Sequence, residues 1–126
     1  MTVETRFTIS DTSDPDLNNH NIQTLTVNNS DAGNAAITVN TSNAQSEFSN
    51  LTVNSADEGL NASQTDGDVS VIQVYDSTFN VANDASGIIL AGTADDRAGF
   101  EVVNNEITSE KLTNTGTVGI DLSNVE

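Results

Sequence analysis

The chain has 126 residues, which suits one domain, and a formal net charge of −16 from nineteen Asp and Glu against three Lys and Arg. It contains no cysteine, which excludes a disulfide framework and a cysteine-based metal centre. The scarcity of Lys and Arg argues against nucleic-acid binding, because contacts with phosphates depend on these residues. No apolar run approaches the ~18 residues of a membrane helix, so we expect no membrane insertion.

Residues 1–21 are predicted to form an N-terminal strand and a capping segment. Phe7 and Ile9 alternate with polar residues, and they look like the last strand of a repeat whose front half is missing. The polar segment 10–21 is expected to fold across the lower end of the structure. Residues 1–6 lack the basic and apolar regions of a signal peptide, so we expect a chain that is complete from Met1.

Residues 22–126 repeat a pair of apolar positions five residues apart, at steps of 26, 26 and 28 residues. The pairs are Ile22 with Val27, Phe48 with Val53, Val74 with Phe79, and Val102 with Ile107. A glycine follows in every copy, at Gly33, Gly59, Gly87 and Gly119. Alternating apolar residues come next: Ile37 and Val39, Leu60 and Ala62, Ile88 and Leu90, Ile120 and Leu122. Each copy is therefore predicted to contain three short strands, separated by a tight turn and a glycine-containing loop.

Strands this short cannot bury a face alone, but stacked on equivalent neighbours they enclose one continuous core. A coil of three parallel strands per turn fits the repeat length best. Asn28, Asn54 and Asn80 follow the second apolar position in three copies, and we expect their amides to bond one another as a ladder across ~4.8 Å. A β-sandwich of eight to ten short strands is the alternative.

The segments Phe100-Glu-Val-Val-Asn-Asn-Glu-Ile-Thr, Gly119-Ile-Asp-Leu, Ile72-Gln-Val and Ser86-Gly-Ile-Ile-Leu resemble the right-handed parallel β-helix family, the pectate-lyase-like solenoids. The resemblance covers about residues 22–124. It implies an all-β fold, a short single-chain right-handed parallel β-helix of about four coils over residues 22–126. It implies no particular activity, because this architecture hosts enzymes, adhesins and viral spikes.

The catalytic motifs of the family are mostly missing. Its galacturonan hydrolases carry Asn-Thr-Asp, Asp-Asp, Gly-His-Gly and Arg-Ile-Lys, and only Asp95-Asp96, followed by Arg97, is present here. One adjacent pair is expected by chance among nineteen acids. His20 has no nucleophile beside it and is interpreted as a surface loop residue. We therefore predict that the protein is not an enzyme, with no catalytic residue and no cofactor.

Candidate calcium ligands do not match a known pattern. The clusters are Asp57-Glu58, Asp66-Gly67-Asp68 and Asp95-Asp96, and none has the spacing of an EF-hand or of a glycine-rich nonapeptide repeat. A hydrated acidic surface is the preferred interpretation, so we predict no dedicated metal site. Four N-glycosylation sequons occur, about as many as chance gives, at Asn28, Asn40, Asn50 and Asn61.

The acidity is the most informative property. A charge of −16 on 13.2 kDa repels itself, and molar salt reduces that repulsion by shortening the Debye length to ~3 Å. One lysine against nineteen acids resembles proteins of salt-loving archaea. An ordinary acidic bacterial surface protein is the alternative.

The leading hypothesis is a structural virion protein of a haloarchaeal tailed virus, namely a capsid decoration, turret or tail-fibre subunit, located on the virion or outside the cell in high salt. The chain stops four residues after Leu122, so we expect an uncapped upper end and a partner there. The expected partners are further copies, with a homotrimer favoured, other virion proteins such as the capsid shell, and host surface glycans. The alternatives are a surface adhesin or carbohydrate-binding module of a halophile and, less favoured, a small polysaccharide-active enzyme.

Overall fold

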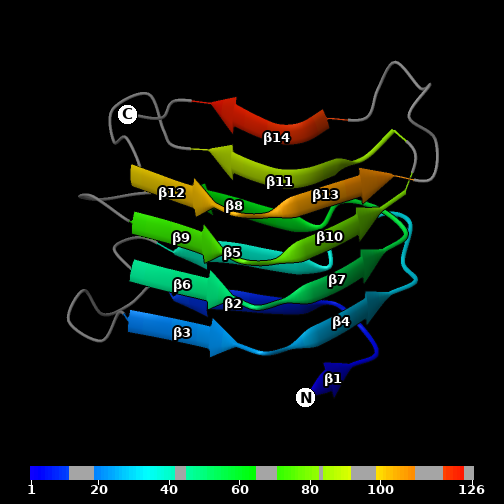
Figure 1. Cartoon of the computed structure of the whole chain (residues 1–126), viewed down its shortest axis with the longest axis horizontal. Helices are drawn as coiled ribbons and strands as arrows, with labels where there is room; N and C mark the ends of the chain where they lie inside the picture. Colours follow the sequence, from blue (N-terminus) through cyan, green and yellow to red (C-terminus); the bar gives the residue numbers. More distant parts are fainter. Residues whose placement is uncertain are drawn as a thin grey trace.

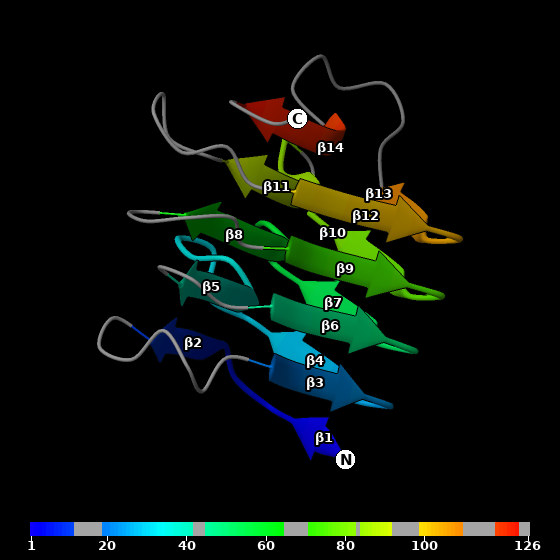
Figure 2. The same cartoon turned by 90° about the vertical axis from the view of Figure 1, so that its left-hand side faces the viewer.

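The computed structural model describes residues 1–11, 19–41, 45–64, 71–82, 84–91, 99–109 and 118–123. Every regular element in these ranges is a β-strand, and the strands stack into three parallel sheets (Figure 1). Figure 2 shows the same stack from the side, with the lower strands near the N-terminus and β14 at the top. The predicted parallel β-helix is therefore confirmed, and the parallel pairing rules out the sandwich.

Each sheet collects one strand from every coil. Sheet A contains β1 (Thr2–Val3), β4 (Thr26–Asn29), β7 (Thr52–Ser55), β10 (Thr78–Val81) and β13 (Glu106–Ser109). Sheet B contains β2 (Phe7–Asp11), β5 (Ile37–Thr41), β8 (Leu60–Gln64), β11 (Ser86–Ala91) and β14 (Val118–Ser123). Sheet C contains β3 (Asn19–Gln23), β6 (Gln45–Ser49), β9 (Val71–Tyr75) and β12 (Gly99–Val103).

The coil is right-handed. In Figure 1 the strands of sheets C and A run from left to right in front, those of sheet B return behind them, and the chain rises from its N-terminus. Figure 2 confirms that sheet C lies in front of sheet B in the first view. Each full coil passes through sheets C, A and B in that order, which gives four full coils above a partial first coil.

The first coil is more complete than the sequence indicated. Strand β2 pairs with β5, with Phe7 opposite Ile37, as expected for the last strand of a repeat. Strand β1 pairs with β4 through Val3 and Val27, so the first coil has a sheet A strand as well as its sheet B strand. Of the three strands of a full coil, it lacks the one in sheet C. The predicted boundary between residues 21 and 22 falls inside β3, and residues 12–18 of the expected cap lie outside the described residues.

The apolar positions of the repeat form columns in the core. Val27, Val53, Phe79 and Ile107 are register partners through sheet A, as predicted, and the first three are fully buried. The first members of the apolar pairs align in the same way through sheet C: Ile22, Phe48, Val74 and Val102. Because side chains alternate along each strand, every second side chain points into the core. Side chains at equivalent positions of successive coils therefore stack there in columns.

The tight turn between sheets C and A has the same backbone conformation in every full coil. Its central residue has a positive φ, between 48° and 61°, at Thr24, Asn50, Asp76 and Asn104. Asn and Asp adopt this left-handed conformation more readily than other non-glycine residues, which explains three of the four positions. The stacked turns bond through the backbone, as between Asn50 N and Tyr75 O at 3.2 Å.

Close packing between coils requires glycine at two of the repeated positions, Gly59 and Gly87. Gly59, Gly87 and Gly119 stack in one column of sheet B, and a Cβ at Gly59 would overlap the Gly87 carbonyl oxygen and come within 2.8 Å of Phe79 Cδ1. Gly33 lies outside this column, because the pairing of Ile37 with Leu60 places Ala36 opposite Gly59. A longer loop after β4 displaces Gly33 from the repeat.

Gly59→Ala is therefore expected to lower the free energy of unfolding by about 2–3 kcal/mol, the usual cost of overpacking a core. Gly119→Ala is the matched control, because the same column there leaves nothing within 4 Å of the added Cβ. Chemical denaturation in molar salt measures both variants. Equal midpoints for the two would contradict the close approach of the coils at Gly59.

Candidate functional site: the asparagine ladder and its groove

The predicted asparagine ladder runs along the outer face of sheet A. Asn80 Nδ2 donates to Asn54 Oδ1, and Asn54 Nδ2 donates to Asn28 Oδ1, each at 2.8 Å. Both ends are closed by a different residue: Thr108 Oγ1 donates to Asn80 Oδ1, and Asn28 Nδ2 donates to Glu4 Oε1 at 3.0 Å. All donors point towards the N-terminal end, so the amide dipoles are aligned and the Glu4 carboxylate lies at their positive end.

Each ladder amide keeps part of its hydrogen-bonding capacity. An asparagine side chain has two N–H donors and an oxygen that accepts two hydrogen bonds. Asn28, Asn54 and Asn80 each use one donor and one acceptor position within the ladder. One N–H and one lone pair per coil thus remain for solvent or a ligand, in a row fixed by the strand spacing of ~4.8 Å.

A groove of about 600 Å3 follows the ladder across four coils. Glu4, Asn28, Asn54 and Asn80 form one side, and the corner where sheet A ends forms the other. The corner residues are Asn29, Ser30, Ser55, Ala56, Val81 and Ala82. A volume of this size falls within the range of small-ligand sites.

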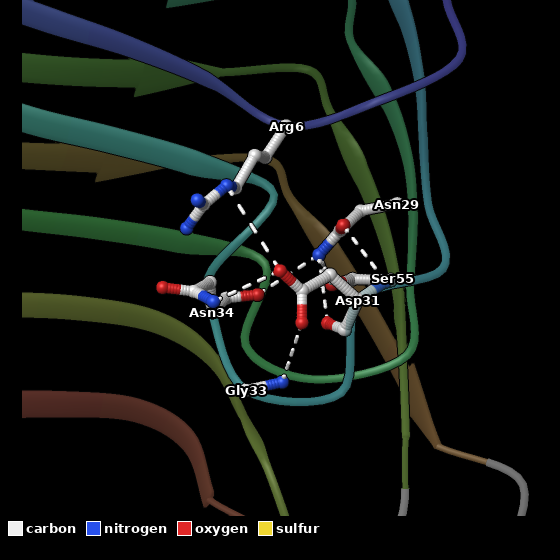
Figure 3. A network of polar contacts seen from close by, with 6 residues as sticks. All are labelled: Arg6, Asn29, Asp31, Gly33, Asn34 and Ser55. Carbon is white, nitrogen blue, oxygen red and sulfur yellow. Dashed lines mark hydrogen bonds and ion pairs between the residues drawn. The ribbon is translucent and has the colours of Figure 1, made fainter.

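The corner wall is held by a polar network around Asn29 (Figure 3). The buried Asn29 Nδ2 donates to Asn34 O at 2.8 Å and to Ser55 Oγ at 3.2 Å, and Asn29 Oδ1 accepts from Asp31 N. Asp31 in turn accepts from Gly33 N and Asn34 Nδ2, and it lies 4.0 Å from Arg6 Nε. This network fixes the loop after β4 and gives the groove a rigid edge.

The face that carries the ladder is nearly free of charge. Its outward positions on β4, β7 and β10 are threonine followed two residues later by asparagine: Thr26 and Asn28, Thr52 and Asn54, Thr78 and Asn80. Acidic residues lie at its two ends, at Glu4 and Glu106, and at Asp76 in the turn before β10. Parallel stacking would place like charges directly opposite one another, which is unfavourable in a sheet.

A second polar cluster lies on the outer face of sheet C. Tyr75 Oη donates to Glu101 Oε2 at 2.7 Å, and Gln73 Nε2 donates to both groups. The hydrogen bond to the carboxylate raises the pKa of Tyr75 and, from the other side, lowers the pKa of Glu101. The three side chains are exposed or half-buried and bond one another, so the cluster tethers β9 to β12.

Of the three acidic clusters that the sequence offers, the structure describes one, Asp57-Glu58. Asp57 and Glu58 are half-buried in the loop after β7, where Asp57 N bonds Ser55 Oγ and Glu58 Oε2 accepts from Asn61. Residues 65–70 and 92–98, which include the other two acidic clusters and Arg97, lie outside the described residues. Within the described ranges, no group of three or more His, Asp or Glu is placed to hold a metal ion.

His20 does not lie in a loop, contrary to the expectation. It belongs to strand β3 and is the register partner of Ser46, whose buried Oγ has no hydrogen-bond partner in the described part of the chain. The same column continues upwards to Ile72 and Phe100. The sequence did not predict β3 over its full length, because the strand, Asn-His-Asn-Ile-Gln, has one apolar residue and so shows no alternation of apolar and polar residues.

Of the sequon residues, Asn28 is engaged in the ladder and Asn61 donates to Glu58, whereas Asn50 occupies the exposed turn. The side chain of Asn40 lies outside the described residues.

The sequence reasoning missed Glu4 as the end of the ladder and the Tyr75 cluster. The signal for Glu4 was available, because Thr2-Val3-Glu4 repeats the spacing of Thr26-Val27-Asn28. The cluster at Tyr75 had no sequence signal, since it joins residues 26 and 28 positions apart.

No family model, curated protein or solved structure matches the chain in the comparisons. Among the described residues there is no helix long and apolar enough to cross a membrane.

Proposed function

We propose that the protein is a structural subunit of an extracellular assembly in high salt, with the virion of a haloarchaeal tailed virus as the leading candidate. In that setting it would serve as a capsid decoration, turret or fibre subunit that contacts further copies and the capsid shell. A stack of identical coils makes a stiff body, and an acidic exterior remains solvated when salt screens its charge.

The upper end of the solenoid carries this proposal. Sheet B buries its inward column completely at Leu60 and Ile88, but the next members of that face, Ile120 and Leu122, are 41% and 53% exposed. The strands β12, β13 and β14 also present an unpaired edge among the described residues. Exposed apolar side chains beside an open strand edge favour contact with another chain.

We expect light scattering in molar salt to give a mass well above 13.2 kDa, with three chains as the favoured number. Leu122→Asn should shift the mass towards that of one chain. Val103→Asn is the matched control, because Val103 is similarly exposed but lies on the outer face of sheet C opposite Tyr75. A wild-type monomer under these conditions, with no partner in its native particle, would remove the main support for the proposal.

A second candidate, a surface adhesin or carbohydrate-binding module, is favoured by the groove beside the ladder. The groove is of ligand size and lined mostly by Asn and Ser residues, and its free amide groups suit hydroxyl-rich partners. The groove lies beside sheet A, whereas β14 lies at the top of the stack (Figure 1), so an end-on partner at β14 would leave it open. Both roles are compatible with one molecule.

A further inference from the structure

We infer that the groove along sheet A binds a single uncharged glycan strand lying parallel to the solenoid axis, and that it discriminates against acidic glycans. This inference rests on the second candidate function and adds the class, the orientation and the charge of the ligand. It follows from the hydrogen-bonding capacity of the ladder, the charge distribution around it and the shape of the groove.

The ladder defines the direction of the ligand. The free N–H and lone pair of Asn28, Asn54 and Asn80 recur along the axis at the strand spacing of ~4.8 Å. A partner that uses all three must be extended along the axis and must offer a donor and an acceptor at each repeat. Sugar hydroxyls do both, whereas a carboxylate only accepts.

The ladder also holds its amides ready for binding. Each amide is fixed by one hydrogen bond above and one below, so binding does not have to order these side chains. Pre-organised groups lose little conformational entropy when a ligand binds, which strengthens binding for a given number of contacts.

The charge around the groove selects against anions. Among the described residues that line it, Glu4 alone carries a charge, and that charge is negative. The chain as a whole carries −16, so an acidic polymer would approach against the field of the protein. In molar salt the long-range repulsion between the protein and an acidic glycan is screened. Direct contact of a glycan carboxylate with Glu4, at the lower end of the groove, remains unfavourable.

The opposite wall suits the flat face of a sugar ring. Ala56 and Ala82 are small, apolar and half-buried, and they line the groove at the corner, whereas Val81 turns its side chain into the core. A ring between the two sides would contact methyl groups on one side and amides on the other. A volume of about 600 Å3 is enough for part of an oligosaccharide.

The test is titration calorimetry of the full chain in 1 M and 3 M NaCl with cellohexaose, N-acetylchitohexaose and hexagalacturonate as probes. We expect at least one of the neutral hexamers to bind and hexagalacturonate to bind at least ~10-fold more weakly. Asn54→Ala should weaken neutral binding by ~10-fold or more, since it removes the free N–H and the free lone pair that Asn54 offers the ligand at the centre of the row. Asn61→Ala, on the outer face of sheet B, is the control and should bind as the wild type does.

Two further variants separate the contributions. Ala82→Phe fills the groove without changing the ladder, and it should abolish binding even if Asn54→Ala proves too unstable to measure. Glu4→Gln keeps a side-chain oxygen for Asn28 but removes the charge, so it should retain neutral binding and reduce the discrimination against hexagalacturonate.

The inference is overturned if neither neutral hexamer binds, if hexagalacturonate binds as tightly as they do, or if Ala82→Phe binds like the wild type. None of these results bears on the mass measured by light scattering, so failure of the groove and failure of the assembly proposal are distinguishable.

Discussion

Val53→Asp is expected to lower the free energy of unfolding by several kcal/mol. Val53 is fully buried in the middle of the sheet A column, between Val27 below and Phe79 above. A carboxylate there has no cation among its register partners, and an unpaired buried charge costs about 3–5 kcal/mol. That is a large part of the ~5–15 kcal/mol by which domains are usually stable. Circular dichroism and urea denaturation in molar salt measure the effect.

Two matched variants make the result specific. Thr52→Asp adds the same charge one residue earlier, on the exposed face of β7, and should change the unfolding free energy by less than about 1 kcal/mol. Val53→Ala removes only apolar volume and should cost about 2 kcal/mol. If Val53→Asp melted like Thr52→Asp, position 53 would not belong to the core.

The thermal midpoint is expected to rise steeply when NaCl or KCl increases from about 0.01 M to molar concentration. The Debye length falls from ~30 Å to ~3 Å over this range, so acids that repel one another across the whole solenoid become screened. Asp31 lies 4.0 Å from Arg6, but the chain has only three Lys and Arg to pair with nineteen Asp and Glu. Excluded salts add to the effect by strengthening apolar burial. A midpoint that is flat or falls across a salt series followed by circular dichroism would argue against the halophilic interpretation.

Acidification should imitate salt only in part. Neutralising exposed carboxylates at low ionic strength removes repulsion, which favours the folded state. Glu101 acts in the opposite direction, because its hydrogen bonds from Tyr75 and Gln73 lower its pKa. The contribution of Glu101 to the free energy of unfolding is present above the pKa that this carboxyl has in the unfolded chain. It is lost as the pH falls through the lower pKa that Glu101 has in the folded protein. Glu101→Gln should therefore show a larger gain on acidification than the wild type.

Sequence spacing predicted the coils because the core of this fold repeats. Every coil must place the same inward positions over those below, so Ile22 and Val27 predict Phe48 and Val53 one coil later. The Asn ladder was predictable for the same reason. Gly33 lies in the loop between β4 and β5, as the spacing predicted, but spacing could not show that it falls outside the column of Gly59, because loop lengths vary between coils.

The sequence by itself determined the repeat, the three strands per coil, the inward columns and the acidity, because each of these follows directly from residue spacing or from composition. Only the tertiary structure showed that Glu4 closes the ladder, that a groove lies between the ladder and the corner at Ala56, and that Tyr75 meets Glu101. These features depend on side chains from different coils that meet across gaps of 24 to 28 residues. Their geometry is set by the register and by the shape of the turns, and neither is fixed by the local pattern of any one segment.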